Sequence, residues 1–116
     1  MKRLVARFYR TQAGSEPVRA WLMSLEEADR KIVGKDIATV EFGWPIGMPV
    51  CRPLRDGLYE VRSTVRAGRV EARTYFSIDG NVLVLLHGAE GKSRQGDAIA
   101  LAIARLRDYQ RRKQPE

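Results

Sequence analysis

The segment 52–87 constrains the fold of this chain more than any other part of it. Residues 57–64 and 69–78 alternate between apolar and polar side chains, and 82–86 is a continuous apolar run that ends at His87. Glycine-containing turn signals separate these stretches, and one of them is the Asp-Gly pair that is typical of tight hairpins. The pattern therefore predicts three consecutive antiparallel strands, of which the last lies in the interior of a sheet.

Alternation along the first two strands collects polar side chains on one face of the predicted sheet. Tyr59 falls on the other, apolar face by parity. The polar face gathers a carboxylate, two arginines and a tyrosine, with the only histidine at the end of the third strand: Glu60, Arg62, Arg73, Tyr75 and His87. Side chains of these kinds on one sheet face are typical of a surface that handles phosphate.

The same arginines also have a purely structural interpretation. Exposed strands of antiparallel sheets carry charges, so Arg62–Glu60 and Arg73–Glu71 could be ion pairs that contribute little energy. A histidine at a strand end, such as His87, is more often a capping or packing residue than an acid. The residues alone leave both interpretations open.

Composition restricts the class of protein. The length of 116 residues, with 44% hydrophobic and 30% charged residues, predicts one globular domain that spans 1–116. The chain has no apolar run of about eighteen residues and no signal-peptide pattern, so we expect a cytoplasmic protein without a membrane partner. The single cysteine, Cys51, excludes an internal disulfide, and we expect a structural thiol there rather than a nucleophile.

The basic residues favour a nucleic-acid partner. The net charge is +7, and 16 arginines and 5 lysines make up the basic residues. Arginine binds phosphate through a planar fork and stacks on bases, whereas lysine would suffice for solubility. The alternative explanation is a genome of high GC content, which enriches arginine without regard to function.

The segment before the predicted strands reads as one strand and two helices. Residues 2–10 predict a first strand, and Ser15 is expected to cap a helix that has Pro17 in its first turn. The pattern Ser-Leu-Glu-Glu at 24–27 predicts a capping box that opens a second helix, and the two helices should form a hairpin over one face of the sheet. The buried face of the second helix is predicted to comprise Ala28, Ile32, Val33, Ile37 and Val40.

The remaining segments are two loops and a final helix. Three prolines predict that 43–53 is irregular, although its apolar side chains should pack against the core. Residues 88–96 are expected to form a second loop, and 97–112 a helix. The expected buried side chains are Trp44, Ile46, Met48 and Val50 in the first loop and Ile99, Ala102, Ile103, Leu106 and Tyr109 in the helix. The order βαα-βββ-α predicts an α+β domain with an antiparallel-rich, four-stranded sheet.

Motifs that would announce a cofactor are absent from the sequence. It contains no phosphate-binding glycine loop, no dinucleotide fingerprint, no nucleophile elbow and no metal-ligand spacing. We therefore expect neither a metal nor a cofactor.

Two runs of sequence, taken together, resemble a known family. PLRDGLYEVRS at 53–63 and ARTYFSIDGNVLVLLHG at 72–88, followed by a loop with a lysine and an arginine-rich helix, resemble the RelE/ParE toxin superfamily, specifically its phage-derived HigB-like branch. The resemblance covers nearly the whole chain and implies a RelE-like fold. It also implies a toxin of a type II toxin–antitoxin system, neutralised by a cognate antitoxin that commonly has a helix-turn-helix. HigB and RelE members cut mRNA on the ribosome and need no metal.

The resemblance also implies roles for individual residues. RNA scission uses the 2′-OH as an internal nucleophile, so the protein must move protons and stabilise charge on the phosphate. Arg73 matches the arginine two residues before the aromatic on the family's third strand, and with Arg62 it would clamp the scissile phosphate. Glu60 and His87 are the candidate base and acid. Contacts with phosphate or RNA are assigned to Lys92, Arg94, Arg55 and Tyr75.

The loop after His87 departs from the family pattern. Ala89 replaces an aromatic residue, Gly91 replaces a lysine, and Gly96-Asp97 replaces a Thr-Pro pair, with Gly96 as an acceptable helix N-cap. The polar sheet residues favour a ribosome-dependent mRNA endonuclease, which is our prediction. A DNA gyrase inhibitor of the ParE type would use the same fold. An inactive module that only binds an antitoxin is favoured by the altered loop.

Overall fold

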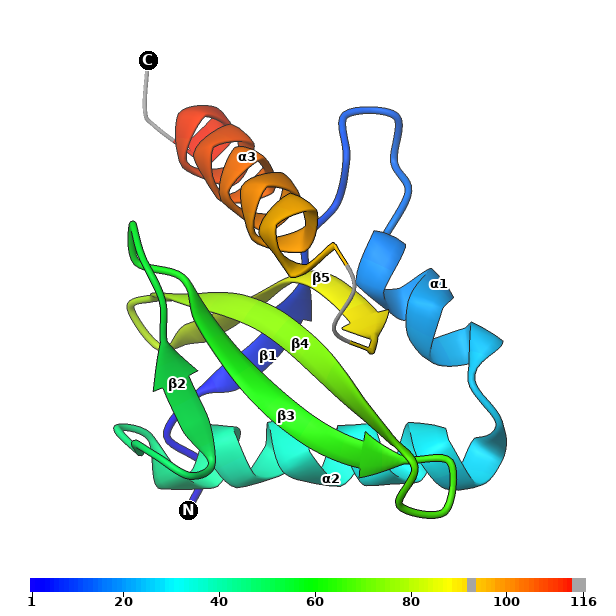
Figure 1. The fold of residues 1–116 in the computed structure, drawn as a ribbon. Coiled ribbons are helices and arrows are strands. Elements are labelled where there is room, and N and C mark those ends of the chain that lie inside the picture. The colour runs from blue at the N-terminus through cyan, green and yellow to red at the C-terminus, as the bar shows by residue number, and fades with distance from the viewer. Residues whose placement is uncertain (92–93, 114–116) are drawn as a thin grey trace.

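A computed structural model describes residues 1–91 and 94–113 of the chain. Within these residues, five strands and three helices follow one another in the order β1, α1, α2, β2, β3, β4, β5, α3 (Figure 1). The strands are β1 (Val5–Phe8), β2 (Cys51–Pro53), β3 (Tyr59–Val65), β4 (Val70–Asp79) and β5 (Val82–Glu90). The helices are α1 (Pro17–Ser24), α2 (Glu27–Gly43) and α3 (Gln95–Lys113).

The strands form a single sheet in the order β1-β5-β4-β3-β2. β1 is parallel to β5, and the other neighbours are antiparallel. The α+β class is therefore confirmed, but the sheet has five strands rather than the predicted four. The additional strand is β2, which lies in the proline-containing segment that we predicted to be irregular. Proline is tolerated there because β2 is an edge strand, where a missing N–H interrupts no further pairing.

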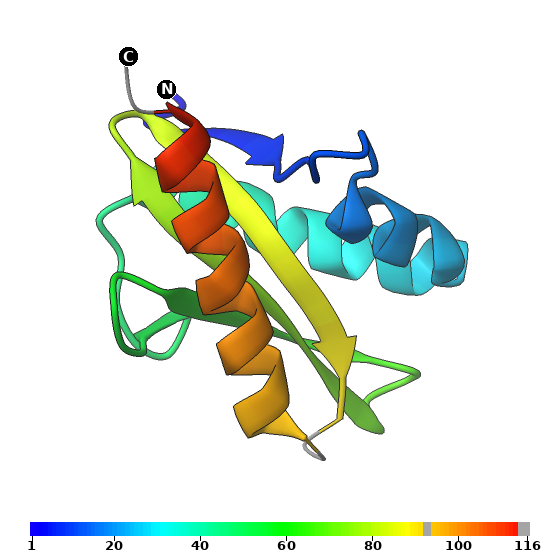
Figure 2. The same ribbon diagram turned by 90° about the horizontal axis from the view of Figure 1, so that it is seen from above.

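Helices cover both faces of the sheet (Figures 1 and 2). α1 packs against β5 and α2 against β3 on one face, while α3 crosses β4 and β5 on the other. Both α1 and α2 lie on the same face, as expected, but each packs mainly against the sheet rather than against the other helix. The loop before β2 contributes Trp44, Ile46 and Val50 to this core, whereas Met48 is exposed.

The start of α1 differs from the predicted cap. The helix begins at Pro17 with Glu16 as its N-cap, so the assignment of Ser15 as the cap is wrong. The Ser15 hydroxyl lies 2.9 Å from the Thr11 hydroxyl, and the Ser15 N–H donates to the same oxygen. Ser15 therefore closes the turn before the helix, and proline at the first helical position begins α1 without a side-chain cap.

The predicted capping box at the start of α2 is also absent. Ser24 is the last residue of α1, and its hydroxyl donates to the Trp21 carbonyl at 2.6 Å. A serine hydroxyl that satisfies a carbonyl of its own helix is not available to cap the next one. Glu26 takes the N-cap position of α2 without a side-chain hydrogen bond, and the acidic first turn suits the helix dipole.

The buried face of α2 is confirmed in its second half and wrong in its first. Val33, Ile37 and Val40 are buried, but Ala28 and Ile32 are exposed. An open groove of about 930 Å³ lies beside these two residues, between α2 and the turn that joins β3 to β4. Ala28 and Ile32 therefore border an open groove rather than the core.

A β-bulge interrupts the pairing between β4 and β5. Phe76 is paired with Leu85, and the preceding residue Tyr75 is paired with His87, so Leu86 is an extra residue in β5. A bulge of this kind shifts the alternation of the strand by one residue. Leu86 packs in the core under α3, and His87 stacks on Tyr75 on the same side of the sheet.

β5 continues past the predicted end of the third strand. It runs to Glu90, which is paired with Ala72, so the loop predicted at 88–96 begins later and His87 lies inside the strand. β4 is long enough to pair with these extra residues. After the bulge, Gly88 faces α1 and lies directly against the Trp21 ring.

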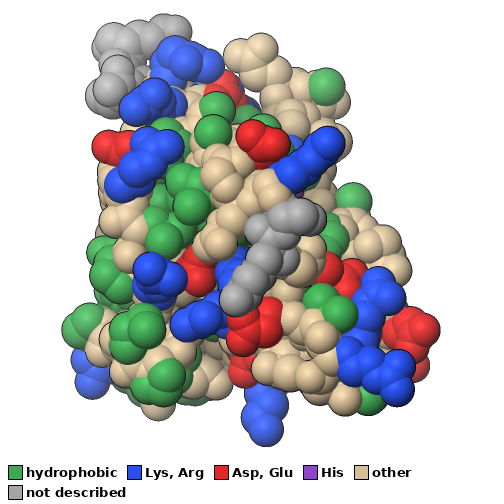
Figure 3. Space-filling view, in the orientation of Figure 1, with side chains coloured by type: hydrophobic (Ala, Val, Ile, Leu, Met, Phe, Trp, Pro, Cys, Tyr) green, Lys and Arg blue, Asp and Glu red, His purple; other side chains and the backbone are tan. Residues whose placement is uncertain are grey.

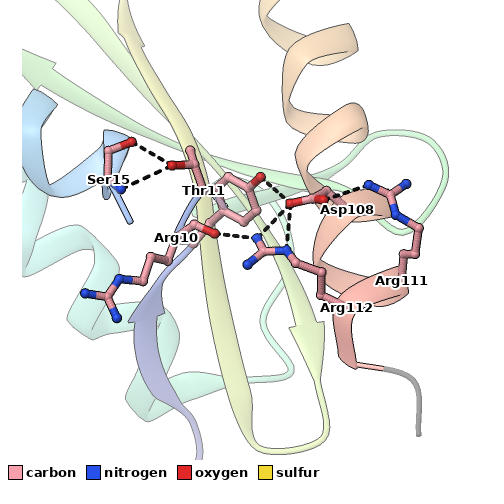
Figure 4. A network of polar contacts seen from close by, with 7 residues as sticks. Arg10, Thr11, Ser15, Asp108, Arg111 and Arg112 are labelled. Atoms are coloured by element: carbon pink, nitrogen blue, oxygen red, sulfur yellow. Dashed lines mark hydrogen bonds and ion pairs between the residues drawn. The ribbon is translucent and has the colours of Figure 1, made fainter. Parts of the chain in front are cut away.

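α3 is confirmed as the final helix, although it begins at Gln95 and so contains Gly96 in its first turn. Its buried side chains are Ala98, Ala102, Ile103 and Leu106, with Ile99 and Tyr109 partly buried. Figure 4 shows how its C-terminal half is tied to the segment after β1. The Tyr9 hydroxyl donates to Asp108 at 2.6 Å, and Arg112 donates to Asp108 at 2.7 Å and also to the Arg10 carbonyl.

This network predicts a loss of stability in acid. Hydrogen bonds from Tyr9 and Arg112 lower the pKa of Asp108 below its ordinary value of 3.8. A carboxyl group whose pKa is lowered in the folded state stabilises the fold at pH values above its ordinary pKa. This contribution is lost as the pH falls through the pKa of the folded state. We expect Asp108→Asn to be less stable than wild type at pH 6 and close to it at pH 2, in urea unfolding at both pH values. Asp36→Asn on α2 is the control, and a difference that does not change with pH would contradict the prediction.

Candidate functional site

Strand pairing brings the predicted site residues together on the sheet face that carries α3. Glu60 on β3 is paired with Tyr75 on β4, and Tyr75 with His87 on β5. Arg62 is paired with Arg73 in the next row of side chains. Five residues from three strands therefore form two adjoining rows. The alternation of the sequence predicted the four on β3 and β4, and the bulge in β5 adds His87 to the same face.

Two carboxylates balance the paired arginines. Glu60 Oε2 lies 3.7 Å from the Nε atoms of both Arg62 and Arg73. Glu71 Oε1 lies 3.4 Å from Arg73 Nη2 and 3.7 Å from Arg62 Nη1. We call these four residues the arginine cluster. The structural ion pairs that we considered are thus present, and α3 adds Gln95, whose amide donates to Glu60 Oε1 at 3.4 Å.

The members of the arginine cluster differ in exposure. The side chains of Glu60 and Arg73 are 1% and 4% exposed, whereas that of Arg62 is 33% exposed. Arg73 Nη1 also donates to the Gly91 carbonyl at 3.0 Å, which ties the end of β5 to the cluster. Among the described residues, Glu60 Oε2 and Arg73 Nε have no hydrogen-bond partner. Arg62 is therefore the guanidinium of the cluster that a ligand can reach.

Tyr75 and His87 form an aromatic pair beside the cluster. Their rings are stacked with centroids 5.9 Å apart and an angle of 21° between the planes. Burial lowers the pKa of His87, and the positive charge of Arg105 lowers it further. Burial raises the pKa of Tyr75, and the charge of Glu60 adds to this effect while Arg73 opposes it. The imidazole and the phenol are therefore both uncharged at neutral pH.

A pocket of about 300 Å³ opens between the end of β5 and the first turns of α3. Tyr75 and His87 line it from the sheet, and the exposed Arg94 lines it from the start of the helix. The small side chain of Ala89 also lines the pocket. The full lining of the pocket is Tyr75, His87, Ala89, Gly91, Arg94, Gln95, Asp97, Ala98 and Leu101. An arginine, an imidazole and an aromatic ring around one pocket are groups that can contact a nucleotide.

Among the predicted residues that the structure describes, Arg55 does not join this site. Arg55 lies in the turn between β2 and β3, its side chain is 62% exposed, and its hydrogen bond goes to the neighbouring Asp56 at 3.0 Å. Lys92 lies outside the described residues. Cys51 is 1% exposed in the core, and burial raises the pKa of its thiol to about 11, as befits a packing residue.

Sequence reasoning missed three polar residues next to the site. Arg52 on β2 is paired with Glu60 and extends its row, but the prolines around it concealed the strand. Gln95 and Arg105 reach the site from α3. Arg105 lies three residues after Ala102 and one before Leu106, at the edge of the buried stripe of the helix. That spacing was the available signal for a side chain directed at the sheet.

The charges on this face are mixed. Figure 3 shows Lys and Arg side chains interspersed with Asp and Glu side chains over it, rather than one continuous basic surface.

Within the described ranges, no group of three His, Cys, Asp or Glu side chains could hold a metal ion. Nor does any helix in the described part of the chain have the length and apolar character needed to cross a membrane.

Comparison with known proteins identifies the fold. No protein-family model matches the sequence, and no curated protein matches it. Among solved structures, the chain is similar to the E. coli toxin RelE, determined in the free state as a mutant in which two arginines are replaced by alanine. The TM-score is 0.58 at 17% sequence identity, and the similarity covers 91% of this chain and 99% of that one. The chain thus has a RelE-like α+β fold, as the resemblance implied, while the assignment to the HigB-like branch stays a prediction.

Proposed function

We propose that this chain is the toxin of a type II toxin–antitoxin system, of the HigB-like branch, and that it cleaves mRNA on the ribosome. The observation that supports this most directly is the position of Arg62. Its partly exposed guanidinium lies on the same sheet face as a pocket lined by Tyr75, His87 and Arg94, in a RelE-like fold. A basic group on the sheet face that also carries a pocket of about 300 Å³ suits a phosphate and its adjacent base.

The proposed reaction is attack of a 2′-OH on the neighbouring phosphorus, which forms a 2′,3′-cyclic phosphate and breaks the bond to the 5′-oxygen. The 2′-OH proton passes to solvent water, and solvent water supplies the proton that the leaving 5′-oxygen takes up. Arg62 and Arg94 would bind the phosphate and stabilise its increasing negative charge. Tyr75 would orient the substrate from the wall of the pocket, and His87 would donate to a substrate oxygen. Because Glu60 is 1% exposed and lies between two arginines, we assign it to positioning them rather than to proton transfer. Arg73 would hold Glu71 and the Gly91 carbonyl in place beneath the bound phosphate.

The partners follow from the same proposal. A toxin of this class acts in the cytoplasm on the ribosome and its mRNA, and a cognate antitoxin, commonly of the helix-turn-helix type, would neutralise it. Lys92, on the segment between β5 and α3, remains a predicted contact with phosphate or ribosomal RNA. No residue of the site requires a metal for this chemistry, because internal attack by a 2′-OH needs only proton transfer and charge stabilisation.

Arg62→Gln tests this function with little risk to folding. We expect a short induction of the wild type in bacteria to arrest growth and to produce new mRNA 5′ ends inside translated codons. Loss of one positioned cation should reduce this cleavage by about 100-fold. Arg19→Gln, an equal loss of charge at an exposed position of α1, should behave as wild type.

Other outcomes would assign a different function. Growth arrest with intact mRNA and a DNA-damage response would indicate a gyrase inhibitor of the ParE type. If soluble wild-type protein does not arrest growth, the chain is a binding module that docks an antitoxin without catalysis. Equal cleavage by wild type and Arg62→Gln would remove Arg62 from the proposed mechanism.

A further inference from the structure

Arg105 links α3 to the bulge in β5. Its Nη1 atom donates to the main-chain carbonyl of Leu86 at 2.8 Å and lies 3.3 Å from Nδ1 of His87. Leu86 is the residue that the bulge adds to β5, and His87 is the residue that the bulge turns toward Tyr75. One guanidinium nitrogen therefore contacts both residues that distinguish this part of the strand from a regular ladder.

The chemistry of arginine determines which ring nitrogen of His87 carries the proton. A guanidinium has only N–H donors and no acceptor, so Nδ1 must accept in this contact. A neutral imidazole has a single N–H, which is then on Nε2. The ring is neutral at pH 7 because burial and the charge of Arg105 both oppose a second proton. The nitrogen of His87 that remains for a ligand is thus a hydrogen-bond donor.

We propose that Arg105 is a positioning residue, which holds His87 in the Nε2–H tautomer and fixes the orientation of its ring beside the pocket. This role rests on the proposed function in one respect: the proposed function is what makes His87 a hydrogen-bond donor to the substrate. The helix that carries Arg105 is itself anchored by Asp108, one turn further along, to Tyr9. Arg105 also lies 6.0 Å from the centre of the Tyr9 ring. Docking of α3 therefore sets the state of His87.

Other charged or titratable groups face His87 from each neighbouring element. Tyr75 stacks on it from β4, and Arg94 and Asp97 line the pocket from the start of α3. Tyr75 is uncharged at neutral pH. Among the described residues, Arg105 is the side chain with a hydrogen-bond contact to the imidazole. Removing Arg105 should consequently change the tautomer and the pKa of His87, whereas removing a cation elsewhere on α3 should change neither.

The chain has a single histidine, so nuclear magnetic resonance can follow it directly. Two-bond proton–nitrogen correlation spectra report which ring nitrogen is protonated, and a pH titration gives the pKa. We expect the Nε2–H tautomer and a lowered pKa in the wild type and in Arg107→Ala, a matched loss of charge at an exposed position of α3. Arg105→Ala should show mixed tautomers and a higher pKa that still lies below the ordinary value, because burial remains.

A tautomer and pKa in Arg105→Ala that equal those of the wild type would overturn the proposal. If Arg105→Ala does not fold, Arg105→Gln decides the matter, since it removes the charge and retains a donor for the Leu86 carbonyl; an unchanged His87 pKa would then reject the role. These measurements do not require cleavage. A wild type without nuclease activity would overturn the proposed function and leave the Arg105 result valid. An active enzyme whose His87 does not respond to Arg105 would overturn the positioning role alone.

Discussion

Replacement of Gly88 by alanine is expected to destabilise the protein by about 3 kcal/mol, at the upper end of the usual cost of overpacking a core. A Cβ atom on Gly88 would lie 2.1 to 2.5 Å from three atoms of the Trp21 ring. The obstacle is a rigid indole packed against the core between α1 and β5, so it has little freedom to move away. Urea unfolding followed by circular dichroism measures the change in free energy.

Gly34→Ala, a substitution of the same type, is expected to change the stability of the protein in the opposite direction. Gly34 lies inside α2, it is exposed, and a Cβ there would meet no atom within 4 Å. Alanine should therefore stabilise the protein by about 1 kcal/mol, the difference in helix propensity. A double variant, Gly88→Ala with Trp21→Ala, should cost less than the sum of the two single variants because the clash is gone. Equal effects of Gly88→Ala and Gly34→Ala would contradict the predicted contact.

Replacement of Arg73 by alanine is expected to cost about 3 kcal/mol of folding free energy. The substitution leaves the carboxylate of Glu60, which is 1% exposed, without one of its two cations. It also removes the donor to the Gly91 carbonyl and one partner of Glu71. An uncompensated charge inside a protein is costly because it has lost its water without gaining a partner.

Comparison with Arg62 tests whether burial is the cause. Arg62→Ala removes the same charge from the same carboxylates, but its side chain is 33% exposed and its ion pairs are 3.7 Å long, so the cost should stay below about 1 kcal/mol. The double variant Glu60→Gln with Arg73→Gln should lose less than the sum of the single variants, since no charge is left alone. Equal losses for Arg62→Ala and Arg73→Ala would refute the assignment. The difference also affects assays of function, because loss of activity in Arg73→Ala combines folding with chemistry.

Local patterns were sufficient for the existence of β3, β4 and β5 and for the polar face of β3 and β4. Alternation between apolar and polar residues depends on a period of two along an extended chain, so it placed Glu60 and Arg62 together without knowledge of the fold. The turn at Gly80 and the buried stripe of α3 were predicted for the same reason, since each depends on residues close in sequence. The predictions of the helix caps were wrong because Ser15 bonds to the Thr11 hydroxyl and Ser24 bonds to the Trp21 carbonyl of its own helix.

The short strand β2 and the far end of β5 required partners that are distant in sequence. Cys51–Pro53 is extended because β3 offers it a ladder, and its prolines conceal this from local analysis. Residues 88–90 stay in β5 because β4 is long enough to pair with them. Whether a segment becomes an edge strand, and where a strand ends, depends on the availability of a neighbouring strand. The alternation of apolar and polar residues along the sequence carries no information about such a neighbour.

By itself, the sequence determined the α+β class, the three central strands and the set of side chains that share the polar face, because these follow from periodicity along short segments. Only the tertiary structure decided how those side chains are oriented, how far they are buried and which partners they have. The bulge at Leu86 turned His87 toward Tyr75, and the approach of α3 brought Arg105 to the imidazole. The same packing buried Arg73 and left Arg62 accessible, although both arginines have the same parity with respect to the sheet. Burial and hydrogen bonding depend on neighbours far away in the chain, and these neighbours distinguish two arginines that the sequence pattern treats alike.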